Sequence, residues 1–201
     1  KRVSTISALA SLLATPLSKT TFDTTLRMDQ HSVFGEKITG RMTASYQPSQ
    51  SLLVKLGGGT GFRAPSLDEM YGQYNTNDPS YYKADANGDF TVVYGNSALE
   101  PESSTSFDAG LYYNLDTLGT KLSASIFNIK VDKAISYDSG DPNDWYDGSY
   151  KQLGTKSQRQ GIDLQVDFTL DGGSKIGLSY TGVTDEKGKN VTNIPKHIFN
   201  L

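Results

Sequence analysis

Apolar and polar residues alternate with a period of two along much of this chain. The pattern is clear in residues 22–28, 107–113 and 162–168, where every second position is apolar or small. Successive side chains of a β-strand point to opposite faces, so this alternation predicts strands with one apolar face and one polar face. We expect nine strands, at approximately residues 3–13, 20–30, 37–47, 51–62, 103–114, 120–131, 156–170, 174–184 and from 196 onward.

The connections between these strands alternate between short and long. The short ones contain Pro, Gly or Asp, residues that favour tight turns. The long ones are residues 31–36, 63–102, 132–155 and 185–195. In an antiparallel up-and-down meander, this alternation places every short turn at one end and every long loop at the other. Strands of ten or more residues with this asymmetry are typical of outer-membrane barrels, which close to pair all backbone groups in lipid. The predicted fold class is therefore all-β, an antiparallel meander forming part of a transmembrane β-barrel.

Composition excludes several other classes of protein. The chain has no Cys, which excludes a disulfide scaffold, thiol catalysis and Cys-type zinc sites. No run of about 18 apolar residues is present, so no transmembrane helix is expected. A net charge of −3 provides no basic surface for nucleic acid. The low hydrophobic content of 36% fits a barrel, because only alternate strand residues would face lipid.

Three ordered motifs resemble the TonB-dependent outer-membrane receptors. The first is residues 59–72, which begin with a Gly-x-Gly-Phe-Arg-Ala-Pro-Ser-Leu run, and the second is residues 95–104, where Ser97 replaces the Pro usual in the family. The third, residues 107–113, looks like the strand that follows these boxes. Weaker matches continue to residue 197 in family order. The resemblance implies a barrel of about 22 strands that holds an N-terminal plug domain.

The resemblance also implies a function in nutrient import driven by the TonB complex. We expect residues 1–201 to be a partial barrel domain, from which the plug and the C-terminal strands are absent. The implied location is the outer membrane of a Gram-negative bacterium. The implied partners are membrane lipid, an iron–siderophore or similar chelate, TonB-ExbB-ExbD acting through the absent plug, and colicins or phage. Haem and cobalamin are alternative ligands, and haem is disfavoured because residues 66–95 contain no His.

Candidate ligand-binding residues lie in the two longest loops and at the upper end of the lumen. Aromatic rings with hydroxyl or indole donors bury area and still form hydrogen bonds, which suits a siderophore, corrinoid or sugar. The chosen residues are Arg63, Tyr81, Tyr82, Trp145 and Tyr146. The alternative interpretation is that Arg63 forms a structural pair, and that the aromatic residues pack the loops or form an interfacial girdle. No resident cofactor is expected. Asp85, Asn87 and Asp89 place oxygens at alternate positions and are candidate ligands for structural calcium, and the favoured alternative is a solvated turn without a metal.

No catalytic residues are predicted. The two histidines, His31 and His197, lie near opposite ends of the chain, and neither a nucleophile elbow nor a phosphate-binding glycine loop is present. An outer-membrane hydrolase is therefore the weakest alternative. A complete small barrel, acting as a passive channel or adhesin, is the stronger rival, because 201 residues would suffice for about eight strands.

Overall fold

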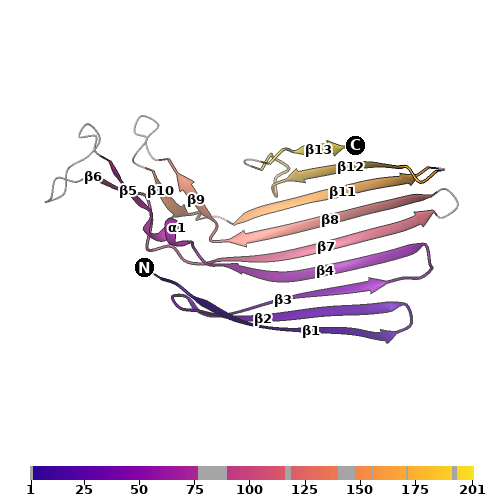
Figure 1. Ribbon diagram of the computed structural model, residues 1–201, viewed down its shortest axis with the longest axis horizontal. Helices are drawn as coiled ribbons and strands as arrows, with labels where there is room; N and C mark the ends of the chain where they lie inside the picture. The colour runs from indigo at the N-terminus through magenta and orange to yellow at the C-terminus, as the bar shows by residue number, and fades with distance from the viewer. Residues whose placement is uncertain are drawn as a thin grey trace.

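The computed structural model of the protein describes residues 2–76, 90–115, 119–139, 148–154, 156–170, 172–191 and 194–201. Its main element is a nine-stranded sheet in the order β1-β2-β3-β4-β7-β8-β11-β12-β13 (Figure 1). The strands are β1 (Thr5–Leu17), β2 (Thr20–His31), β3 (Gly35–Tyr46), β4 (Leu52–Arg63), β7 (Glu102–Leu115), β8 (Thr120–Asp132), β11 (Ser157–Thr169), β12 (Lys175–Thr184) and β13 (His197–Asn200). Every neighbouring pair is antiparallel, which confirms the predicted meander.

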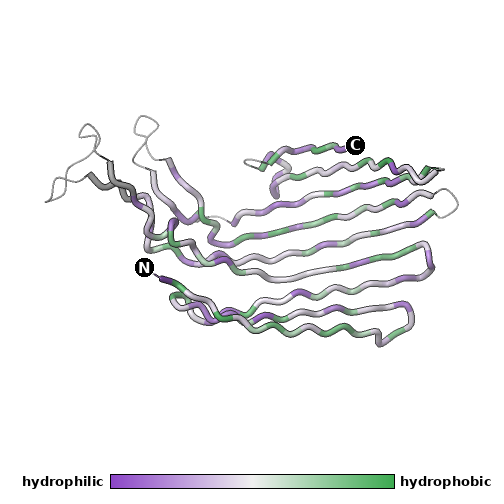
Figure 2. Tube along the Cα trace, viewed as in Figure 1, coloured by the Kyte–Doolittle hydropathy of each residue, from purple (hydrophilic) through white to green (hydrophobic). Residues whose placement is uncertain are grey.

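The strand register gathers the apolar residues on one face of the sheet. Leu56 lies opposite Ala109, and Ile126 lies opposite both Ala109 and Ile162. Directly paired residues point to the same side, so the apolar set continues from strand to strand. Figure 2 shows hydrophobic and hydrophilic residues alternating along the strands. Leu56 is 50% exposed and Ile126 is 53% exposed, so this face is an open apolar surface of the kind that lipid covers.

The opposite face of the sheet is polar and carries ion pairs between strands. Arg41 of β3 and Asp108 of β7 form an ion pair of 2.5 Å across the intervening strand β4. The pair passes over Gly57, where a Cβ atom would lie 2.6 Å from both partners. At Gly59 a Cβ would lie 2.8 Å from the backbone oxygen of Gly40. Glycine at these positions thus permits close approach within the wall.

No second layer packs against the described sheet. Among the residues that the structure describes, the buried apolar side chains are Met70, Leu99 and Val183. Two of these, Met70 and Leu99, belong to the β4–β7 connection rather than to the sheet. The apolar faces of the strands therefore do not meet one another in a closed interior. No helical segment in the described part of the chain has the length and apolar content needed to span a bilayer.

The β1–β2, β3–β4, β7–β8 and β11–β12 connections lie at one end of the sheet, and the β2–β3 turn and the two longest connections lie at the other (Figure 1). The first four of these connections are two, five, four and five residues long, respectively. The β4–β7 connection contains helix α1 (Leu67–Tyr71) and the hairpin of β5 (Gln73–Thr76) and β6 (Phe90–Val93). The β8–β11 connection contains the hairpin of β9 (Ile135–Asp138) and β10 (Ser149–Gln152).

Two predicted boundaries are wrong. The connection predicted as long at residues 31–36 is a turn of three residues between His31 and Gly35. Gly35 has a φ of 70°, and His31 Nδ1 accepts the backbone N–H groups of Val33 and Phe34, which together close a tight turn. The first strand was predicted to end at residue 13 but continues to Leu17, because an irregularity in register accommodates residue 16, a proline that has no N–H to donate.

The sheet has two outer strands and is not closed in this chain. β1 pairs only with β2, and β13 pairs only with β12, among the residues that the structure describes. A complete small barrel would require these two strands to pair with each other. The observed arrangement is that of a barrel segment.

Candidate functional site

Helix α1 begins the cluster of contacts at the base of the long loops. Ser66 caps the helix: its Oγ accepts the N–H of Glu69 at 3.0 Å, and Glu69 Oε2 accepts the N–H of Ser66 at 2.7 Å. This reciprocal capping box satisfies two backbone donors that a short helix would otherwise leave unpaired. It also holds the Glu69 carboxylate on the side of the helix that faces the end of β4.

Arg63, the last residue of β4, joins this helix to the wall. Its Nη1 donates to Glu69 Oε2 at 2.9 Å, and its Nε donates to Glu102 Oε2 at 2.6 Å. The other carboxylate oxygen of Glu102, the first residue of β7, accepts the backbone N–H of Ile135 at 2.6 Å. A planar guanidinium with several fixed donors is suited to bridging two carboxylates in this way.

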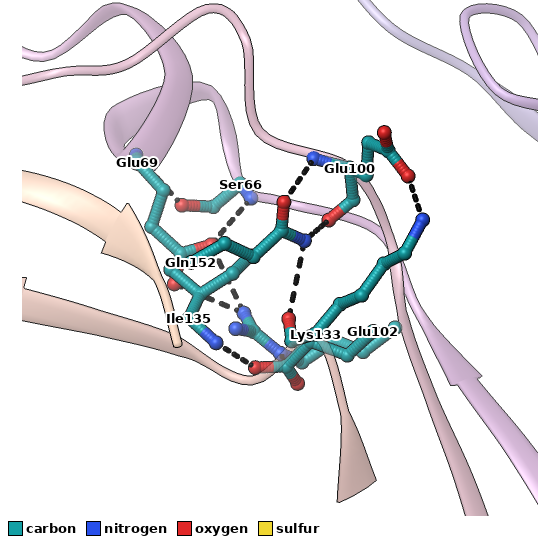
Figure 3. A network of polar contacts seen from close by, with 8 residues as sticks. Ser66, Glu69, Glu100, Glu102, Lys133, Ile135 and Gln152 are labelled. Atoms are coloured by element: carbon teal, nitrogen blue, oxygen red, sulfur yellow. Dashed lines mark hydrogen bonds and ion pairs between the residues drawn. The ribbon is translucent and has the colours of Figure 1, made fainter. Parts of the chain in front are cut away.

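The same contacts extend to the second long loop, as Figure 3 shows. Gln152 of β10 donates through Nε2 to the backbone oxygens of Glu100 at 2.6 Å and Lys133 at 3.1 Å. Its Oε1 accepts the N–H of Glu100 at 3.2 Å, and Lys133 Nζ forms an ion pair with the Glu100 carboxylate. We call these side chains the loop-base network: Arg63, Ser66, Glu69, Glu100, Glu102, Lys133 and Gln152. The network connects the bases of both long loops at one part of the rim, the edge of the wall formed by the ends of β4, β7 and β8.

A second set of contacts joins the two loops farther from the wall. The N–H of Tyr150 donates to the backbone oxygen of Tyr94 at 3.0 Å, and Asn96 Nδ2 donates to the oxygen of Tyr150 at 3.0 Å. The rings of Tyr137 and Tyr150 are 5.2 Å apart in an edge-on arrangement, and Tyr94 lies 6.3 Å from Tyr150. These three tyrosine rings therefore lie close together where the two long connections meet.

Two glycines allow the start and the end of the β4–β7 connection to close on each other. A Cβ on Gly95 would lie 2.3 Å from the backbone nitrogen of Gly72 and 2.6 Å from that of Tyr71. The N–H of Gly95 donates to the oxygen of Gly72 at 2.9 Å. Both glycines belong to the motifs singled out in the sequence, so those motifs meet in space at the base of the loop.

An open groove of about 710 Å³ runs beside α1. Its lining includes Asp68, Tyr71, Gln73 and Tyr94. The Tyr94 hydroxyl donates to Asp68 Oδ1 at 2.7 Å, and this bond, the largest cause, raises the pKa of Tyr94 above its ordinary value. A groove with aromatic walls and a few polar groups has the character of a small-molecule site.

Glu69 is held in its charged form by its partners. Burial is the largest influence and would raise its pKa, but the hydrogen bonds from Arg63 and from the Ser66 N–H together outweigh it. The net result is a pKa below the ordinary value of 4.5. The carboxylate is therefore ionised at neutral pH and available to Arg63.

The structure places one of the predicted ligand-binding residues. Arg63 occupies the centre of the loop-base network, and its side chain is 46% exposed. Its observed contacts match the structural role considered from the sequence, and ligand contact remains a prediction. The others, Tyr81, Tyr82, Trp145 and Tyr146, lie outside the described residues, as do the calcium candidates Asp85, Asn87 and Asp89. Within the described ranges, no three His, Asp or Glu side chains gather closely enough to hold a metal ion.

Sequence reasoning missed most of the loop-base network. The Ser66-x-x-Glu69 spacing is a capping-box signature and could have predicted α1 inside the loop. Glu102 and Gln152 carry no such local signal, because their partners are distant in the sequence. The long loops therefore contain more regular structure than was expected.

Two outer-membrane proteins of Vibrio cholerae serotype O1 are similar in sequence. The vitamin B12 transporter BtuB is 25% identical over 178 residues, covering 88% of this chain and 25% of BtuB. The iron-regulated outer membrane virulence protein is 25% identical over 190 residues, covering 87% of this chain and 27% of that protein. The chain thus spans about a quarter of the length of these curated relatives.

Solved receptor structures share the fold. The ferric enterobactin receptor PfeA of Pseudomonas aeruginosa, in a variant bound to enterobactin, superposes with a TM-score of 0.73 at 18% identity, covering 98% of this chain and 30% of PfeA. The family model described as "TonB dependent receptor-like, beta-barrel" matches residues 4–201. The meander, the ordered motifs and this match over nearly the whole chain agree, and the chain belongs to the TonB-dependent receptor β-barrel family.

Proposed function

We propose that this chain forms part of the barrel wall of an outer-membrane receptor that imports an iron–siderophore. The two long loops would form part of the external rim, and the groove beside α1 would form part of the ligand surface. A plug domain in the full-length receptor would complete the site and would contact TonB-ExbB-ExbD. Such exposed loops would also be accessible to colicins or phage.

The observation that carries this proposal is the convergence of both long loops on the loop-base network. Arg63 joins helix α1 of the first connection to the start of β7, and Gln152 joins the β9–β10 hairpin of the second connection to Glu100 at the same part of the rim. Binding residues are commonly placed on loops that a rigid scaffold positions. A rim held in this way presents the Tyr94, Tyr137 and Tyr150 cluster as one surface.

Cobalamin uptake is the second candidate. It is favoured by the similarity to BtuB, a vitamin B12 transporter. A corrinoid is large and partly apolar, and it suits aromatic loops as well as a siderophore does. Haem remains less favoured, because residues 66–95 contain no His.

Growth rescue tests the proposal. The full-length receptor containing this chain is expressed in a strain that lacks its own siderophore and cobalamin receptors. Growth is measured with a ferric siderophore or haem as the sole source of iron, or with cobalamin as the sole source of that vitamin. Rescue by at least one ferric siderophore, abolished when TonB is deleted, is the expected result. Rescue by cobalamin alone would establish the second candidate, and rescue that survives TonB deletion would indicate a passive channel.

A further inference from the structure

The two long loops are more acidic than the rest of the chain. Residues 64–101 contain six acidic and one basic side chain, and residues 133–156 contain four acidic and three basic. The whole chain has 22 acidic and 19 basic residues, so the remainder is net positive. The negative charge is therefore concentrated on the segments that the proposed function places at the external rim.

The described cations of these loops and of the adjacent strand end are all engaged with carboxylates. Arg63 is bound by Glu69 and Glu102, and Lys133 is bound by Glu100. The other two described cations, Lys151 and Lys156, pair with Asp138 at 2.8 Å and Asp132 at 3.1 Å. A cation that is already paired contributes little additional attraction for an anionic ligand.

The groove beside α1 has the same character. Its lining includes Asp68 and contains no Lys or Arg among the described residues. No described cation lies within ion-pair distance of Asp68, whose carboxylate accepts the Tyr94 hydroxyl. The groove therefore combines aromatic walls, hydroxyl and amide groups with one carboxylate and no described cation.

We propose that this rim selects an uncharged or cationic metal chelate and disfavours polyanionic chelates. The inference rests on the proposed function and specifies its substrate class. An uncharged chelate loses no Coulomb energy on approaching the acidic loops, whereas a trianionic one is repelled during approach and when bound. Uncharged ferric trihydroxamates and uncharged corrinoids meet this requirement, and ferric tris-catecholates do not.

The test measures binding of three probes to the full-length receptor containing this chain, at low and at physiological ionic strength. The probes are a ferric trihydroxamate, cyanocobalamin and a ferric tris-catecholate. We expect one of the uncharged probes to bind at least tenfold more tightly than the tris-catecholate. Raising the salt concentration is expected to strengthen only tris-catecholate binding, because salt screens repulsion.

Two variants localise the effect. Asp68→Asn removes one negative charge from the groove and retains an oxygen that can accept the Tyr94 hydroxyl. At low salt it is expected to raise tris-catecholate affinity roughly threefold to eightfold, and to change the affinity of an uncharged probe less than about twofold. Glu186→Gln is the matched control, because Glu186 is exposed in the β12–β13 connection and outside the groove lining. It is expected to leave all three affinities unchanged.

The outcomes separate this inference from the proposed function. If the tris-catecholate binds as tightly as the uncharged probes or more tightly, uptake of a chelate stands and the charge selection is overturned. If Asp68→Asn and Glu186→Gln have equal effects on tris-catecholate binding, selection by the groove is overturned. If no probe binds, the proposed function and the inference both fail.

Discussion

The wall and the loop base of this chain are stabilised in different surroundings. On the wall, Leu26 and Ile126 are 57% and 53% exposed, and the strands are held by backbone pairing. At the loop base, Met70 and Leu99 are 4% and 3% exposed, beneath the loop-base network. The wall depends on a lipid phase to cover its apolar face, whereas the loop base has a small core of its own. Substitutions should therefore act by different rules in the two regions.

The largest effect is expected from a charge on the apolar face of the wall. Ile126→Arg in the receptor containing this chain should cost about 2–4 kcal/mol of stability in a bilayer, the range known for a cation at the membrane midplane. Chemical unfolding in phospholipid vesicles measures it. The control is Ser125→Arg, which points to the opposite face beside Asp163. Equal costs at the two positions would contradict the assignment of the faces.

Substitution by Ala should have different effects on stability at two glycines, Gly95 and Gly58, because their surroundings differ in steric crowding. Gly95→Ala places a Cβ 2.3 Å from the backbone nitrogen of Gly72, whereas Gly58→Ala meets only the oxygen of Ser106 at 3.4 Å. The first should destabilise the loop base by about 1–3 kcal/mol, the usual cost of overpacking. The second should be nearly neutral. Amide hydrogen exchange in α1 measures the difference, and loss of protection in both variants would contradict it.

The Arg63 bridge should show measurable coupling. A double-mutant cycle of Arg63→Ala and Glu102→Ala is expected to give a coupling of about 0.5–1.5 kcal/mol, reduced because Arg63 is 46% exposed. The readout is hydrogen exchange at Ile135, whose N–H donates to Glu102. The same cycle with Lys133 and Glu100, a pair exposed on both sides, should give no measurable coupling. A coupling near zero between Arg63 and Glu102 would contradict the structural role of Arg63 at the loop base.

The smallest effect is a pH dependence confined to the loop base. Because the pKa of Glu69 is lowered on folding, the unfolded chain binds more protons than the folded one as pH falls below 4.5. The stabilisation by Glu69 is complete above that pH and is lost as pH falls through the lowered value. The hydrogen-exchange protection factors of α1, which are corrected for the intrinsic pH dependence of exchange, should fall there, while those of β8 are unchanged. Glu69→Gln should reduce this dependence, and the remainder is expected from Glu102, whose pKa is also lowered by its hydrogen bond to Arg63. A dependence that is unchanged in the variant would contradict the role of Glu69.

The sheet could be predicted from the sequence because its determinants are local. Alternation in residues 107–113 and 162–168 indicated the strands and their faces, and the predicted β7 and β8 boundaries differ from those observed by about one residue. The turn after His31 was not predicted, because it depends on a side-chain acceptor and on a positive φ at Gly35. Pro16 misled the prediction of β1, since a bulge can retain a proline in an outer strand.

The sequence by itself determined the kind of sheet: a period of two places one apolar and one polar face on each strand, whatever its neighbours are. Only the tertiary structure decided which charged and polar residues at the rim contact one another. Arg63, Glu102 and Gln152 are far apart in the chain, and their contacts exist because β4, β7 and the β9–β10 hairpin end at the same place. Alternation is a local pattern that a few residues suffice to show. An ion pair between loops depends on the lengths and the register of whole strands, which bring distant residues to the same place.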